Sequence, residues 1–207
     1  MSSSFQLWND SGQTSAFGGT LQLTHESDFS DNPQQGVLYF GSNNAASGAG
    51  STKVQTVVNP GTDQVTLTPT NGLTAWATSV TQVVGDRVEP TTPNGYVYQC
   101  STAGDTDGTT EPTWPTVVGS TVSDNTCVWT CISERHELTE IRLALTNGGL
   151  AGATPGAALD MGTIILSGSA NQVEVHWQVD NAVPTVGTNA ADPGILLDLN
   201  SCEEVAQ

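Results

Sequence analysis

The stretch that decides the fold of this 207-residue chain runs from Gly85-Asp-Arg-Val-Glu-Pro90 to Asn94-Gly-Tyr-Val-Tyr-Gln-Cys100. Glycine-aspartate and asparagine-glycine pairs are turn signals, because these residues accept positive φ angles at little cost. Each pair here leads into a short run with β-strand composition. The stretch therefore predicts paired strands in the middle of the chain, with an Asn-Gly hairpin turn between them.

Aromatic side chains are concentrated around this stretch. Three of the five Trp and two of the three Tyr lie between positions 76 and 129. They are Trp76, Trp114, Trp129, Tyr96 and Tyr98. A unit of about 60 residues needs large side chains to build a stable core. These aromatics therefore predict a small β module with its own core, which we place at residues 74–132 as an insertion into a larger domain.

The order of these residues resembles the small chitin-binding-type carbohydrate-binding modules. The matching positions are Trp76, Gly85-Asp-Arg-Val88, Tyr96, Tyr98, Pro112, Trp114 and Trp129. The chain differs at Val83-Val84, where that family usually has an aromatic residue. The Gly-Asp-Arg-Val, Asn-Gly-Tyr, Thr-Glu-Pro-Thr-Trp-Pro and Val-Trp motifs are also similar to a module common in structural proteins of tailed bacteriophages. The resemblance covers about a quarter of the chain.

The resemblance to carbohydrate-binding modules implies a glycan site in which aromatic rings stack on sugar faces. The candidate residues are Trp114, Tyr96, Tyr98 and Trp129. Trp114 lies between Pro112 and Pro115 on a predicted loop, so we expect it to be the exposed ring. The other interpretation is that the four rings form the core and that the module is a structural knob.

The sequence outside the module consists of short β-patterned runs separated by Gly, Pro, Ser and Asn. The predicted strands are 20–24, 36–41, 53–58, 64–68, 140–145, 162–166, 172–179 and 195–199. The runs before and after the module each have too few partners to form a domain alone. The fold class is therefore all-β: residues 1–73 and 133–207 are predicted to form one discontinuous Ig-like or jelly-roll-type β-sandwich.

Two of these runs give more detail. In 172–179, Val173, Val175, Trp177 and Val179 alternate with polar residues, which predicts a strand with one buried face. The run 138–145 is also compatible with a helix, because Leu138, Ile141 and Leu145 are spaced near the helical period of 3.6.

A second resemblance lies behind the module. The runs Ala144–Thr146, Ala153–Leu159 and Gly162–Gly168 are similar to a segment of phage virion accessory proteins. The two resemblances imply a capsid decoration protein that binds the major capsid protein or other virion proteins. The alternatives are a tail or baseplate adaptor or fibre component, and a carbohydrate-binding protein for host-surface glycans.

The N-terminal residues 1–19 form a predicted arm that mixes large apolar side chains with Ser, Gly and Asn. The apolar residues are Phe5, Leu7, Trp8 and Phe17. Apolar surface left in water costs about 25 cal/mol per Å². We therefore predict that the arm packs on a neighbouring subunit, which implies homo-oligomer contacts.

The charge balance excludes two classes of partner. The chain has 21 Asp and Glu but only 4 Lys and Arg, for a formal net charge of −17. Nucleic acid and anionic membranes are bound by clustered Lys and Arg, and no such cluster is present. No apolar run approaches the length of about 20 residues that a membrane span needs. The first residues lack a signal-peptide pattern, so we expect synthesis in the cytoplasm and a final location in the virion.

The sequence predicts no catalytic, metal or cofactor site. His25, His136 and His176 lack metal-ligand spacing and are predicted to lie on the surface. No Gly-x-Ser-x-Gly, P-loop or dinucleotide motif occurs. Asp105–Gly108 resembles part of a calcium loop but lacks the closing Glu, so an ordinary turn is expected.

The four cysteines are too few for a disulfide framework. Cys100 can reach Cys127 or Cys131 across a hairpin, or the cysteines are small buried apolar side chains.

Overall fold

The computed structural model describes residues 4–21, 23, 32–180 and 195–207. The chain is all-β, with 42% of residues in strands and 7% in helices, which confirms the predicted fold class. In the described ranges, no helix is long and apolar enough to cross a membrane. The helices in the described part of the chain are three short 3-10 segments: η1 (Leu138–Glu140), η2 (Asn147–Gly152) and η3 (Ser169–Asn171).

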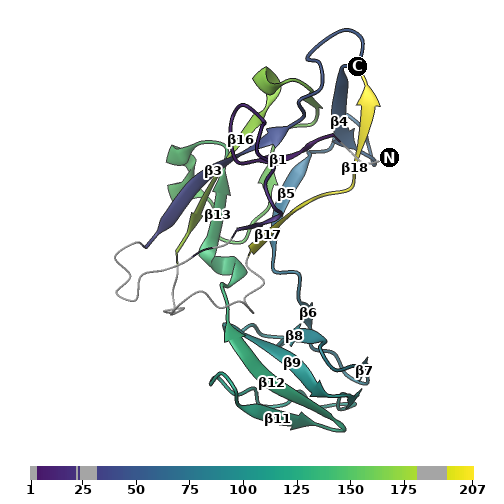
Figure 1. Cartoon of the computed structure of the whole chain (residues 1–207), viewed down its shortest axis with the longest axis vertical. Coiled ribbons are helices and arrows are strands. Elements are labelled where there is room, and N and C mark those ends of the chain that lie inside the picture. Colours follow the sequence, from purple (N-terminus) through teal and green to yellow (C-terminus); the bar gives the residue numbers. More distant parts are fainter. Residues whose placement is uncertain (1–3, 22, 24–31, 181–194) are drawn as a thin grey trace.

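Three antiparallel sheets form the larger part of the molecule (Figure 1). The first has the order β1 (Gln6–Trp8), β3 (Gln34–Gly41), β16 (Val173–Val179) and β13 (Ile141–Ala144). The second has the order β14 (Leu159–Asp160), β5 (Thr66–Thr70), β17 (Ile195–Leu199) and β2 (Thr20–Leu21). The third has the order β15 (Ile165–Leu166), β4 (Thr52–Thr56) and β18 (Cys202–Ala206).

One apolar cluster lies between these sheets. It contains Phe40, Val54, Leu67, Val175 and Ile195, and so draws on segments before and after the central module. Strand β16 shows why this cluster forms. Its buried Val175 and Val179 alternate with polar positions, as a half-buried strand requires.

A second group of strands lies between Thr74 and Glu134 and has its own core. Its main sheet has the order β11 (Thr121–Asp124), β12 (Cys127–Glu134), β9 (Tyr96–Thr102), β8 (Arg87–Glu89) and β6 (Thr74–Ala75). Strands β7 (Thr81–Gln82) and β10 (Gly104–Asp105) form a separate pair. The core contains Trp76, Val88, Tyr98, Cys100, Cys127, Trp129 and Cys131.

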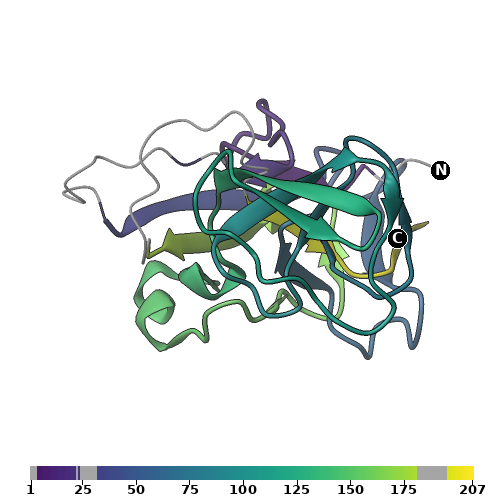
Figure 2. The same cartoon turned by 90° about the horizontal axis from the view of Figure 1, so that it is seen from below.

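We call residues 74–134 the module and the rest the sandwich. The module lies at one end of the molecule, and both chain termini lie toward the other end (Figure 1). Figure 2 views the molecule from the module end, where the long strands β9 and β12 run across the front. This arrangement leaves most of the module surface facing away from the sandwich.

The N-terminal segment differs from the predicted arm. Strand β1 pairs with β3 of the same chain, and Phe5 and Trp8 are only 5% and 7% exposed. The Trp8 indole Nε1 donates a hydrogen bond to the Gly41 carbonyl at 3.0 Å. Leu7 and Phe17 are half-buried and pack against the sandwich core. The protein's own sheet therefore already removes Phe5 and Trp8 from water, while the contact of the arm with a neighbouring subunit stays a prediction.

Other local predictions also need correction. The helical alternative for 138–145 is wrong: only η1 is helical, and β13 follows it directly. Strand β18 (Cys202–Ala206) was not among the predicted strands. Asn94-Gly95 is not a two-residue hairpin turn, because residues 90–95 connect β8 to β9 and Gly95, with φ of 80°, leads into β9. The end of the predicted strand 20–24 lies outside the described residues, as does His25.

Two separate apolar cores predict that the sandwich folds without the module. We expect a variant that lacks residues 74–134, closed by a short Gly-Ser linker and carrying Arg135→Ser, to unfold cooperatively in urea. Arg135 is replaced because its partner Glu89 is removed with the module. A broad, non-cooperative transition in this variant would show that the two parts depend on one shared core.

Candidate functional site

An open groove crosses the surface of the module. It has a volume of about 350 Å³ and is lined by Pro90–Thr92, Asn94 and Glu111–Trp114. The first lining segments belong to the connection from β8 to β9, and the others to the connection from β10 to β11. Loops carry this groove, and the five-stranded sheet together with the β7–β10 pair holds the ends of these loops in place.

Glu111 fixes the position of Trp114 in this groove. Its Oε1 accepts hydrogen bonds from the Trp114 indole Nε1 at 2.8 Å and from the Thr91 backbone N–H at 2.9 Å. The Thr91 hydroxyl donates to the other carboxylate oxygen. Burial raises the pKa of Glu111, but the hydrogen bonds from Thr91 and Trp114 outweigh it, so the pKa lies below its usual value. The carboxylate is therefore ionised and already occupied by donors from within the module.

The four predicted sugar-stacking rings do not form a common platform. Tyr98 and Trp129 are fully buried, and Tyr96 and Trp114 are half-buried. The ring of Trp114 packs 4.4 Å from Tyr98 and 6.0 Å from Trp129, measured between ring centroids. The prediction of a platform is therefore wrong for Tyr98 and Trp129, and Trp114 is not a fully exposed ring. A core this small uses these rings to exclude water from its centre.

The buried aromatics satisfy their polar atoms inside the module. The Tyr98 hydroxyl donates to the Pro115 carbonyl at 2.9 Å and accepts from Asn94 Nδ2 at 2.8 Å. Burial raises the pKa of Tyr98 to about 12. Asp124 Oδ2 accepts from both Trp76 Nε1 and Trp129 Nε1, at 2.8 and 3.0 Å. Asp124 is only 2% exposed, so this carboxylate is a structural centre of the core that our sequence reasoning missed.

The segment Asp105–Gly108, which resembles part of a calcium loop, consists of the end of β10 and the bend that follows it. Asp107 Oδ1 accepts hydrogen bonds from the backbone N–H groups of Thr109 and Thr110, which lower the pKa of Asp107. The Asp107 backbone N–H in turn donates to Asp124 Oδ1 at 2.8 Å. Among the residues that the structure describes, no group of three or more His, Cys, Asp or Glu is arranged to hold a metal ion.

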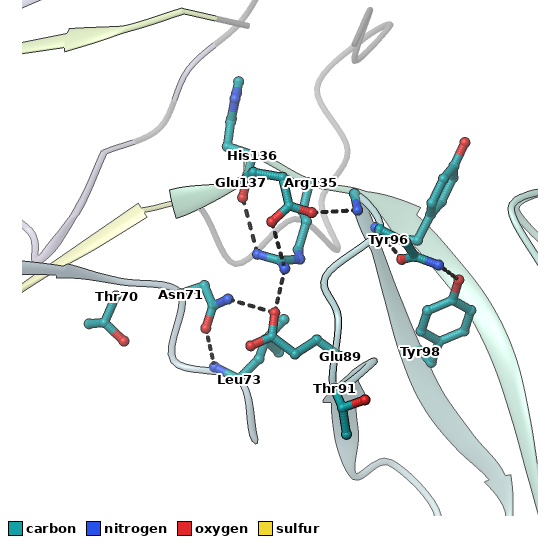
Figure 3. Close-up of polar contacts among 12 residues, drawn as sticks. Thr70, Asn71, Leu73, Glu89, Thr91, Tyr96, Tyr98, Arg135, His136 and Glu137 are labelled. Carbon is teal, nitrogen blue, oxygen red and sulfur yellow. Dashed lines mark hydrogen bonds and ion pairs between the residues drawn. The ribbon is translucent and has the colours of Figure 1, made fainter. Parts of the chain in front are cut away.

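A buried guanidinium joins the module to the sandwich (Figure 3). Arg135 follows β12 directly, and its side chain is 1% exposed. Its Nη2 contacts Glu89 Oε2 at the end of β8, and also Glu137 Oε2 at 3.2 Å. Its Nη1 donates to the His136 carbonyl at 3.2 Å. We call Arg135, Glu89, Glu137 and their hydrogen-bond partners the junction cluster.

The partners of the two carboxylates extend this cluster to the other segments at the junction. Asn71, on the segment that enters the module, donates to Glu89 Oε2 at 3.0 Å. The Gly95 backbone N–H, in front of β9, donates to Glu137 Oε1. Figure 3 shows these side chains converging between the end of the module sheet and the entering segment. The cluster therefore ties together the segment that enters the module, the segment that leaves it, and the loop before β9.

His136 lies next to Arg135 of the junction cluster, and His176 lies on strand β16 of the sandwich. His136 is 3% exposed, and its Nδ1 lies 3.1 Å from Glu140 Oε2. His176 is half-buried, and its Nε2 lies 3.1 Å from Glu174 Oε2. The prediction of surface histidines is therefore wrong for His136, which lies inside the junction and makes a local contact on η1.

A hollow of about 530 Å³ lies beside the junction cluster. Pro93–Gly95 line one side of it, and Glu137, Thr139, Glu140, Arg142 and Asp180 line the rest. Arg142 Nε lies 4.0 Å from Asp180 Oδ2, so the cation and the carboxylate already face one another. This hollow separates the module loop from the sandwich, and the chain crosses beside it through Arg135.

No disulfide joins the cysteines. Cys100, Cys127 and Cys131 are buried in the module and Cys202 is half-buried in the sandwich. The interpretation of small buried apolar side chains therefore holds for the three cysteines of the module.

Comparison with protein-family models, with curated protein sequences and with solved structures found no match for this chain.

The junction cluster predicts a strong dependence of stability on Arg135. Arg135→Met should destabilise the protein by about 3–5 kcal/mol, because it leaves the carboxylates of Glu89 and Glu137 without their buried cation. Urea unfolding followed by circular dichroism measures this loss. Arg87→Met is the matched control, since Arg87 is exposed on β8 and should change stability by less than about 0.5 kcal/mol. Equal stability of the two variants would contradict a structural role for the cluster.

Proposed function

We propose that this chain is a non-enzymatic structural protein of a tailed-phage particle, most simply a capsid decoration protein. In this proposal the sandwich attaches to the major capsid protein or another virion protein, and the module is displayed outward. The observation that carries the proposal is the position of the module at the end of the molecule away from both termini (Figure 1). The junction cluster holds it there in one orientation.

The surface of the sandwich offers a face for attachment. In the third sheet, Ile165 pairs with Val54, and both side chains point into the core. Ile164 and Leu166 alternate with Ile165 and are 41% and 39% exposed. Val57 and Val58, just after β4, are 50% and 66% exposed. Exposed apolar side chains in this number on and beside one small sheet are typical of a protein contact surface.

The third sheet lies at the end of the molecule that suits attachment to a particle. Strands β4 and β18 of the third sheet lie beside the termini and away from the module (Figure 1). Attachment through this sheet would therefore leave the module free. The net charge of −17 keeps unattached copies apart until they meet a surface that fits.

The test is the copy number of the protein on purified particles, measured by quantitative mass spectrometry. We expect a copy number that scales with the capsid surface. A low copy number equal to the rotational symmetry of the tail would favour the tail or baseplate adaptor instead. Absence of the protein from purified particles would contradict both forms of the proposal.

Paired variants test the attachment face in the same assay. Ile164→Glu with Leu166→Glu should lower the copy number at least about tenfold, because charge is placed in an apolar contact. The control is Val83→Glu with Val84→Glu on the module, whose side chains are 59% and 67% exposed and which adds the same charge. A fall in copy number only with the control pair would place the attachment on the module.

The groove supports a second candidate function, which is weak binding of host-surface glycans. The half-buried Trp114 offers part of its ring there, beside Thr92, Thr113 and Asn94. Because the ring of Trp114 packs on Tyr98 and is half-buried, a single site has little area to offer. Many sites on one particle raise avidity by roughly 10²–10⁴ over one site, so binding should be seen on whole particles.

A substitution that fills the groove tests this function better than removal of Trp114, which would also disturb the core. Thr92→Trp places a large ring in the groove from an exposed position and should abolish binding of particles to a glycan array. Ser123→Trp, exposed on β11 and outside the groove, should leave binding unchanged. Arrays that stay blank with unmodified particles would leave the module as a structural knob.

A further inference from the structure

Two buried thiols meet in the core of the module. Cys100 lies in β9 and Cys127 is the first residue of β12. Their sulfur atoms are 3.6 Å apart, and the two residues are 1% and 0% exposed. Neither the groove nor the junction cluster involves them.

The strand pairing distinguishes this pair from the other cysteine nearby. Cys100 lies opposite Trp129, and the register of β12 against β9 shifts between Val128 and Trp129, one residue beyond Cys127. Cys131 lies further along β12, opposite Tyr98. Of the two partners that the sequence allows for Cys100, the structure therefore brings the thiol of Cys127 next to it.

We propose that Cys100 and Cys127 are an oxidative modification site, at which a small-molecule disulfide such as oxidised glutathione closes an intramolecular disulfide. One cysteine thiolate attacks the reagent, forms a mixed disulfide and releases one glutathione thiolate. The second cysteine thiolate then attacks the protein sulfur of the mixed disulfide and releases the other. The two protons of the cysteines end on the two glutathione molecules, so the protein loses two electrons and the reagent gains two.

The environment of the pair makes this reaction slow but its product stabilising. Burial raises the pKa of Cys127 to about 12, so little thiolate is present at neutral pH while the module is closed. Reaction therefore requires transient opening of the module. Once formed, the bond links residues 27 positions apart and encloses the loop that carries Glu111 and Trp114. A loop of this length restricts the unfolded chain and so favours the folded module.

This inference is independent of the proposed function, because it concerns the isolated protein. The purified full-length chain is incubated with oxidised glutathione and its intact mass is measured. We expect a decrease of about 2 Da, and a melting temperature of the module raised by about 10 °C. Added reductant should reverse both changes.

Peptide mapping without reduction identifies the linked residues. Cleavage before Asp124 separates Cys100 from Cys127, and chymotryptic cleavage after Trp129 separates Cys127 from Cys131. We expect one linked pair that contains Cys100 and Cys127. A link to Cys131 or Cys202, a stable mass increase from glutathione adducts, or no reaction even in mild urea would each overturn the proposal.

Serine variants provide the matched comparison. Cys131→Ser should still lose about 2 Da and gain thermal stability on oxidation, whereas Cys127→Ser should do neither. If Cys127→Ser does not fold, the peptide map of the unsubstituted protein decides the assignment by itself.

Discussion

The position of the module depends on one buried charge. The Arg135 guanidinium is withdrawn from water, and an unpaired cation in such a place would cost several kcal/mol. It is paired with Glu89 and Glu137, which lie in different parts of the chain and are held in turn by Asn71 and by the Gly95 backbone. Because each hydrogen bond has a required direction, these groups can be satisfied together in few arrangements. The charge therefore fixes where the module stands on the sandwich.

An apolar junction would fix the orientation of the module on the sandwich less well. Replacing a buried ion pair by apolar side chains of similar volume is often neutral or even stabilising, so net stability does not explain the presence of Arg135. Apolar contacts are non-directional, and two apolar faces can slide against one another. In the proposed role on a virion, a fixed orientation would let all copies present the same face. Orientation is therefore the property that the ion pairs add to the two separate cores.

The sequence predicted buried residues best where the pattern is local, as in the alternation of apolar and polar residues along a strand. Alternation in 172–179 predicted the buried faces of Val175 and Val179, and the density of aromatics predicted a separate core around Trp76 and Trp129. The apolar side chains of Phe5 and Trp8 were expected to be buried, but composition does not show whether they pack against their own chain or against another. The pairing of Arg135 with Glu89 joins residues 46 positions apart, and no short motif marks such a contact. Strand alternation likewise does not show whether the side chains of Tyr98 and Trp129 are exposed or buried in a core.

The aromatic core also limits what the groove can recognise. Four rings of the module use their polar atoms internally: Trp76 and Trp129 donate to Asp124, Trp114 donates to Glu111, and Tyr98 donates to the Pro115 carbonyl. Tight recognition of a sugar needs polar groups that are held in place but still available to the ligand, together with a ring face that is open. Here the ionised Glu111 already receives three hydrogen bonds, and Trp114 lies against Tyr98. The chemistry that stabilises so small a core thus uses the groups that a strong glycan site would require.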